Sequence, residues 1–106
     1  MRSRHVPRRV VHVDLSIGRR SVFQEHVDEL ANRARRIGGN NLESPSFTLA
    51  VSLDALAEHG TGELTVKLDV EHEAALLAAI DEWMLEAHKL PDDVLALRQA
   101  LRRHGV

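Results

Sequence analysis

The sequence VHVDLSI at residues 11–17 alternates apolar and polar side chains along its whole length. Successive side chains of a β-strand point to opposite faces of the sheet, so this alternation predicts a strand with one buried face and one polar face. The same pattern recurs in FTLAVSL at residues 47–53 and in LTVKLDV at residues 64–70. We therefore expect three strands, at about residues 9–17, 46–53 and 63–68, in a sheet with one face toward water.

Helical periodicity fills the interval between the first two expected strands. Ser21 and Gln24 have the spacing of a capping box, and Gly38-Gly39 provides a helix end. Between them, apolar residues recur every three or four positions, which is typical of a helix with one buried stripe. The stripe consists of Phe23, Val27, Leu30, Ala34 and Ile37.

Two further helices are expected after the third strand. Asp69 is placed to cap a long helix, and two acidic residues follow it in the first turn, where the helix dipole favours negative charge. Trp83 falls on the apolar stripe of this helix and is interpreted as a core anchor. Pro91 is suited to a first helical turn and predicts a C-terminal helix over about residues 91–104.

The resulting order is β-α-β-β-α-α, which predicts an α+β fold. A helical connection makes the first two strands parallel, and the short link between the second and third strands makes a hairpin. The simplest arrangement is a three-stranded mixed sheet in the order 1-3-2, with the helices on one face. We expect a two-layer sandwich similar to a ferredoxin-like split unit that lacks its last strand.

The first strand lies at the edge of this expected sheet. Its edge contains Val10, Val11 and Val13 and no internal proline, so it is poorly protected against pairing with another chain. We therefore expect a homodimer, formed through paired first strands or through the C-terminal helix.

Length and composition indicate one ordinary globular domain. The chain has 106 residues, of which 43% are hydrophobic and 28% are charged. Residues 1–8 are expected to be a flexible basic arm, and residues 9–106 a single α+β domain. No apolar run has the length of a membrane span or a signal-peptide core, and cysteine is absent. These features favour a cytoplasmic protein without membrane contact.

Charge is distributed unevenly along the chain. Residues 1–53 carry nine arginines and five acidic residues, whereas residues 54–106 carry five basic and eleven acidic residues. Such an asymmetry is compatible with a surface for an anionic partner, with complementary surfaces in an oligomer, or with simple solvation.

Arg19 and Arg20 precede Ser21 directly at the expected start of the first helix. The free N–H groups and the dipole of a helix N-terminus attract anions and disfavour cations, so a bound anion would balance two arginines there. We therefore consider Arg19, Arg20 and Ser21 as a candidate anion site. The alternative is that both arginines extend into water or pair with a nearby acid.

The N-terminal arm gives a second candidate contact for anions. Its arginines are well suited to the phosphates of a nucleic acid. They are Arg2, Arg4, Arg8 and Arg9. RNA recognition by a sheet normally uses exposed aromatic residues, and the expected polar face has none, so RNA is a disfavoured partner.

No group of residues has the spacing of a catalytic or metal site. His12, Asp14 and Ser16 share one strand face, but alternate residues of a strand lie about 7 Å apart, beyond hydrogen-bond reach. The seven histidines form no zinc-binding pattern, and cysteine is absent. We therefore assign no catalytic residue, no metal ligand and no cofactor.

The favoured interpretation is a small non-enzymatic binding or regulatory module that acts through homodimerisation and contact with a protein partner. The first alternative is an anion-binding module for RNA or a phosphorylated ligand. The second alternative is a small enzyme with a site between sheet and helices, using His12 or His72.

Overall fold

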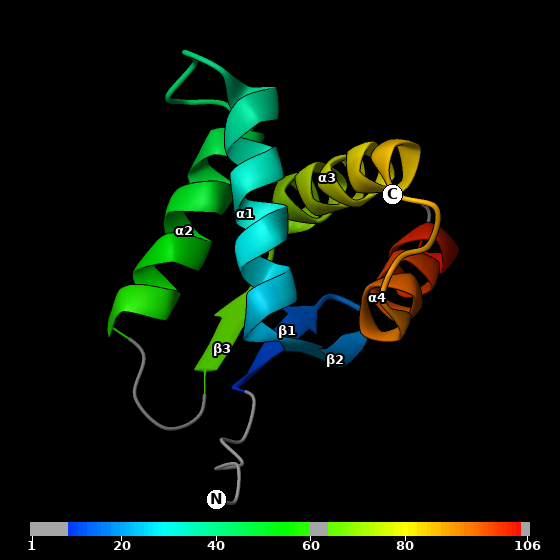
Figure 1. The fold of residues 1–106 in the computed structure, drawn as a ribbon. Coiled ribbons are helices and arrows are strands. Elements are labelled where there is room, and N and C mark those ends of the chain that lie inside the picture. The colour runs from blue at the N-terminus through cyan, green and yellow to red at the C-terminus, as the bar shows by residue number, and fades with distance from the viewer. Residues whose placement is uncertain (1–8, 60–63, 105–106) are drawn as a thin grey trace, which may run out of the picture.

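The computed structural model describes residues 9–59 and 64–104 and has three strands and four helices within them (Figure 1). The chain therefore belongs to the α+β class, with a three-stranded mixed sheet. The elements are β1 (Val10–Leu15), β2 (Gly18–Phe23), α1 (Gln24–Gly38), α2 (Pro45–His59), β3 (Leu64–Lys67), α3 (Val70–Glu86) and α4 (Asp92–Arg103).

The sheet has the order β2-β1-β3, so β1 is the central strand. It pairs with β2 in antiparallel orientation and with β3 in parallel orientation. Val11 lies opposite Val22 on one side and Leu64 on the other. The expected order 1-3-2 is therefore wrong. The first and last expected strands are neighbours, as predicted, but they are parallel and not antiparallel.

One correction concerns residues 18–23, which form β2 and not the start of a helix. Gly18 has a φ of 144°, a conformation that favours glycine, and it allows the chain to reverse directly after β1. Ser21 is consequently a strand residue and caps no helix. The first helix begins at Gln24, and Phe23 occupies its N-cap position without a side-chain hydrogen bond.

A second correction concerns the expected strand at residues 46–53, which lies within α2. Ser44 caps this helix, because its hydroxyl accepts a hydrogen bond from the N–H of Phe47 at 3.1 Å, and Pro45 occupies the first helical position. Leu49 and Leu53 are buried four residues apart, whereas Val51 is 50% exposed. That burial follows the helical period and not the alternation of a strand.

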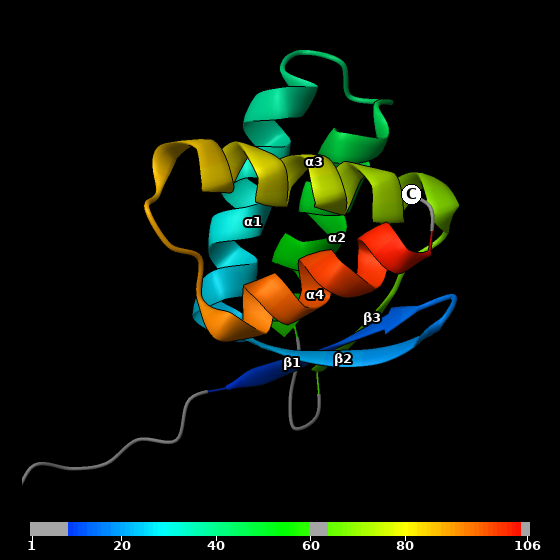
Figure 2. The same cartoon turned by 90° about the vertical axis from the view of Figure 1, so that its right-hand side faces the viewer.

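The described helices lie on one side of the sheet in both views (Figures 1 and 2). In this layer α1 packs along α2, and α3 contacts α1, α2 and α4. The end of α1 approaches the start of α2 so closely that a Cβ on Gly38 would lie 2.9 Å from the backbone nitrogen of Phe47. Gly39 ends α1 with a φ of 57°, as the glycine pair predicted.

The core lies between the sheet and these helices. The inward residues of β1 are buried at no more than 5% exposure, and β3 shows the expected alternation of buried and exposed residues. The prediction that Asp69 caps the next helix is confirmed, since its Oδ1 accepts from the N–H of His72 at 2.8 Å. The apolar stripe of α4 is fully buried, so this helix packs on the domain. The stripe consists of Val94, Leu97, Ala100 and Leu101.

The central position of β1 removes the edge that was expected to form a dimer. Val10, Val11 and Val13 belong to a strand that is hydrogen-bonded on both sides. The edge is unavailable because β2 reverses onto it directly and β3 returns to its other side. Among the described helices, none combines the length and the apolar character needed to cross a membrane.

Candidate functional site

The structure separates the residues of the expected anion site. Arg19 and Arg20 are neighbours on β2, so their side chains leave opposite faces of the sheet. Arg19 shares a face with Asp14, whereas Arg20 pairs with Val13, on the face toward the helices. The helix N-terminus that motivated this site lies beyond them, at Gln24. The helix start that was the reason for a combined site at Arg19, Arg20 and Ser21 is therefore absent from these residues, which form β2.

Arg19 and Ser21 instead belong to a wider polar surface, which we call the outer sheet face. It consists of His12, Asp14, Arg19, Ser21, Thr65 and Lys67, on the side of the three strands away from the helices (Figure 2). The four residues of the two flanking strands are exposed, and the two residues of β1 are half-buried between them.

The outer sheet face has two rows that run across the strands. In one row Asp14 lies in register between Arg19 and Lys67. In the other row His12 lies between Ser21 and Thr65. Nδ1 of His12 is hydrogen-bonded to Oγ of Ser21 at 3.1 Å, and Nη2 of Arg19 donates to Oγ1 of Thr65 at 3.1 Å. The guanidinium of Arg19 thus reaches across the central strand and connects the two rows.

The sheet and α3 differ in charge. The three strands carry three basic residues and one acidic residue, whereas α3 carries five carboxylates and no lysine or arginine. The whole chain has a formal net charge of −2. Of the strand residues, the outer sheet face carries two basic side chains, Arg19 and Lys67, and one acidic side chain, Asp14, in a protein that is acidic overall.

The N-terminal arginines fall largely outside the described residues. Arg2, Arg4 and Arg8 lie there, and so does the expected arm as a whole. Arg9 is described and exposed, and its carbonyl accepts a hydrogen bond from the N–H of Gln24 at 2.8 Å. This contact joins the residue before β1 to the first residue of α1.

The hydrogen-bond partners of Ser16 are not His12 and Asp14, the residues considered together with it in the sequence. Its backbone N–H and its hydroxyl both donate to Oε2 of Glu73, at 3.0 and 2.8 Å, and its Oγ lies 2.7 Å from Nε2 of His104. Glu73 is completely buried, and its Oε1 has no hydrogen-bond partner in the structure. Because the single hydroxyl proton of Ser16 goes to Glu73, Nε2 of His104 is the donor toward Ser16.

These three residues connect the β1–β2 turn, the first turn of α3 and the end of α4, which lie together in Figure 2. Ser16 is thereby held by Glu73 and not by His12 or Asp14. Ser16 is exposed, but its hydroxyl is used for an internal hydrogen bond.

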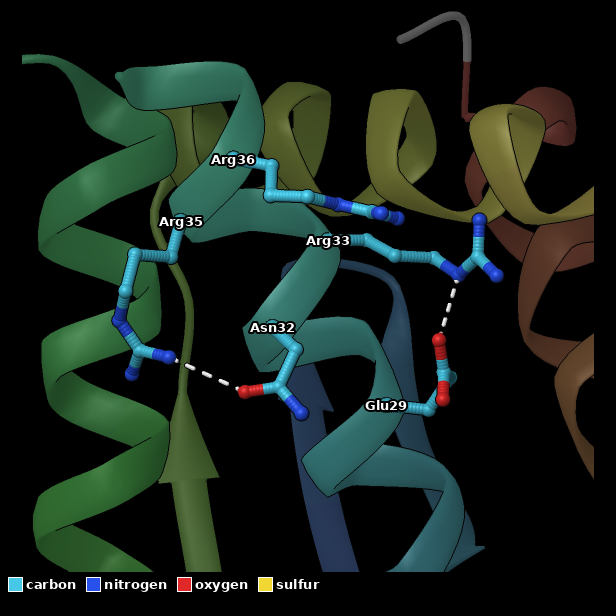
Figure 3. A pocket seen from close by; sticks show the side chains of 5 residues that line it. All are labelled: Glu29, Asn32, Arg33, Arg35 and Arg36. Carbon is cyan, nitrogen blue, oxygen red and sulfur yellow. Dashed lines mark hydrogen bonds and ion pairs between the residues drawn. The ribbon is translucent and has the colours of Figure 1, made fainter.

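A groove of about 470 Å³ lies beside the second half of α1, lined by Glu29, Asn32, Arg33, Arg35 and Arg36. Figure 3 shows Arg33 and Arg36 directed toward α3, whereas Arg35 points toward α2. Each guanidinium has a carboxylate partner. Arg35 pairs with Asp54, and Arg36 pairs with Glu82 at 2.7 Å. The groove is therefore rich in arginine, but its positive charge is already neutralised.

Arg33 is the buried member of this cluster, at 7% exposure. It pairs with Glu29 at 2.7 Å and Glu86 at 3.0 Å, and its guanidinium lies 5.7 Å from the ring centre of Trp83. Burial acts to lower the pKa of Arg33, but the hydrogen bonds to Glu86 and Glu29 outweigh it and raise that pKa. The same hydrogen bond lowers the pKa of Glu86. We interpret this cluster as a structural connection between α1 and α3.

His26 and Asp93 form the described pair that most resembles a general base and its orienting acid. Nδ1 of His26 lies 2.8 Å from Oδ2 of Asp93, which also accepts the N–H of Phe23 at 3.0 Å. Burial acts to raise the pKa of Asp93, but the hydrogen bonds from His26 and Phe23 outweigh it and hold that pKa below its ordinary value. The pair connects the start of α4 to the β2–α1 junction, which accounts for it structurally.

His72 also has a structural partner, since its Nε2 is hydrogen-bonded to Oγ1 of Thr48 at 2.9 Å and connects α3 to α2. Across residues 9–59 and 64–104, no three histidine, aspartate or glutamate side chains are grouped closely enough to hold a metal ion. Nδ1 of His72 also lies 3.5 Å from Oδ1 of Asp69, while the hydroxyl of Thr48 donates to the backbone carbonyls of Ser44 and Pro45. These contacts hold the start of α3 against the start of α2.

Thr65 and Lys67 are the members of the outer sheet face that belonged to no site expected from the sequence. Their place on the polar face of a strand was visible in the sequence, but β2, which brings Arg19 and Ser21 to the same face, was not. Comparison with protein-family models, with curated proteins and with solved structures finds no match.

Proposed function

We propose that the protein is a non-enzymatic binding module whose working surface is the outer sheet face. The single observation that carries this proposal is that the described helices all lie on one side of the sheet, while the other side collects charged and hydrogen-bonding side chains (Figure 2). Two basic side chains, Arg19 and Lys67, flank a single acidic side chain, Asp14, on this face, although the chain as a whole is acidic.

The partner that fits this surface presents negative charge. Arg19 and Lys67 lie at the two sides of the face, with the donor groups of Ser21 and Thr65 beside them. The surface spans three strands, about 10 Å at the usual spacing between strands. It therefore suits an extended partner better than a small enclosed molecule.

An NMR titration of the ¹⁵N-labelled protein tests this proposal. We expect polyglutamate or oligouridylate, as anionic probes, to shift the amide signals of residues on all three strands, and to shift them less at higher salt. Polylysine is the control of opposite charge. Shifts confined to α3 or α4, or no shifts with either anion, would contradict the proposal.

Sedimentation equilibrium tests the homodimer that was expected from the sequence. Its original reason, a free edge on β1, no longer applies. An isologous dimer through the outer sheet face would bring Arg19 and Lys67 of two copies together, which opposes association. We therefore expect a monomer when no partner is added.

A further inference from the structure

The outer sheet face carries an inference about the chemical class of its partner, which rests on the function proposed above. We infer that the partner is the phosphodiester backbone of a nucleic acid, bound without sequence preference.

The kinds of side chain on the face support phosphate. Contacts to nucleic-acid backbones come mainly from arginine and lysine, together with the hydroxyls of serine and threonine. The face combines all four types, as Arg19, Lys67, Ser21 and Thr65. Arg19 already donates to the hydroxyl of Thr65, so its guanidinium is held over the middle of the face. A phosphate bound there would accept hydrogen bonds from the guanidinium and from neighbouring hydroxyls.

The lack of sequence preference follows from what the face does not contain. Its six members include no phenylalanine, tyrosine or tryptophan, so it offers no aromatic platform for stacked bases. Phe23 lies at the end of β2, where its ring meets His26 edge to face at 5.9 Å. Trp83 is on α3, in the helical layer. Recognition is consequently limited to charge and hydrogen bonding along the backbone.

Asp14 sets the strength of this contact. It lies in register between Arg19 and Lys67, so its carboxylate opposes any phosphate that contacts both bases. The contact is therefore weak, and neutralising Asp14 should strengthen it. This gain is a specific consequence of the inference, because most substitutions in a binding surface weaken binding.

The test is fluorescence anisotropy of a labelled oligouridylate with the full chain over a series of salt concentrations. Two phosphate contacts predict a slope of about −1.4 for log affinity against log salt, and each contact removed reduces its magnitude by about 0.7. We expect the smaller slope for Arg19→Ala and for Lys67→Ala, and tighter binding for Asp14→Asn. Arg20→Ala is the matched control, because it removes the same charge from the opposite face of β2 and should leave the slope unchanged.

The outcomes separate this inference from the proposed function. Equal affinity and equal slope for a polyglutamate of the same charge would overturn the phosphate assignment, while strand-specific amide shifts would still support the outer sheet face as an anion surface. If Arg19→Ala and Arg20→Ala weaken oligouridylate binding equally, the contact is general charge attraction and the inference fails. Circular dichroism of each variant checks that the fold is retained.

Discussion

The hydroxyl of Ser16 lies 2.8 Å from Oε2 of Glu73, a residue 57 positions later in the chain. This hydrogen bond joins an exposed turn to a carboxylate that has no exposure to solvent. A buried carboxylate is costly unless hydrogen bonds compensate for its lost hydration. The turn between β1 and β2 therefore has a structural role that its exposed position does not suggest.

Replacement of Ser16 by alanine should lower the stability of the protein. The Ser16→Ala variant keeps the backbone donor but removes the hydroxyl donor from Glu73, at an expected cost of about 1–3 kcal/mol in the free energy of unfolding. Urea denaturation measures this difference. Ser52→Ala, on the exposed side of α2, is the control and should change stability little. Equal effects of the two substitutions would show that the Ser16–Glu73 contact contributes nothing in solution.

Because of Asp93, the free energy of unfolding should decrease when the pH is lowered into the acid range. Its pKa in the folded protein is lowered, so its contribution is fully present above the pKa of the unfolded chain, about 4, and is lost as the pH falls through the lower folded value. The difference in stability between the wild type and Asp93→Asn should therefore be large at neutral pH and shrink at acid pH.

Denaturant unfolding at a series of pH values checks this expectation. Asp92→Asn is the matched control, because Asp92 occupies the same first turn of α4 but is exposed. A difference for Asp93→Asn that stays constant from neutral to acid pH would contradict the prediction.

The buried guanidinium of Arg33 should contribute more to stability than its exposed neighbour Arg36. Replacing Arg33 by methionine leaves Glu29 and Glu86 without their shared cation, and we expect a loss of about 1–3 kcal/mol because these acids are partly hydrated. Arg36→Met removes a more exposed pair and should cost less than about 1 kcal/mol. Chemical denaturation of both variants measures the difference, and the reverse ranking would be inconsistent with the role of Arg33.

Gly38 should resist replacement by alanine although it is a helical residue. Alanine is favoured over glycine in helices by about 1 kcal/mol. A Cβ at position 38 would, however, lie 2.9 Å from both the backbone nitrogen of Phe47 and Oγ of Ser44, and overpacking of this kind costs about 1–3 kcal/mol.

We therefore expect a lower midpoint of thermal unfolding for Gly38→Ala. Asp28→Ala, on the exposed side of α1, reports the effect of helix propensity alone. A higher midpoint for Gly38→Ala would mean that α2 moves away to accept the methyl group.

The sequence predicted those elements whose patterns have one interpretation. The strand at β3, the cap at Asp69 and the glycine end of α1 were predicted in this way. Leu49 and Leu53 lie four apart, which fits both periods, so α2 was misassigned and only the cap at Ser44 distinguished it. Four of the six residues of β2 are exposed, so this strand shows no clear alternation.

The candidate site was only partly predictable for the same reason. A polar face on β1 and β3 was evident from alternation, but the place of Arg19 on that face depended on recognising β2. Glu73 resembled an ordinary acidic residue of a first helical turn. Its burial arises from the packing of α3 against the β1–β2 turn and α4, which no local pattern records.

The central position of β1 has a consequence for synthesis of the chain. Its antiparallel partner follows within a few residues, whereas its parallel partner begins at Leu64, after two helices have been made. A nascent or truncated chain that ends before Leu64 has the backbone groups of His12 and Asp14 unpaired on that side. Such fragments therefore present an aggregation-prone edge that the finished protein covers with its own later residues.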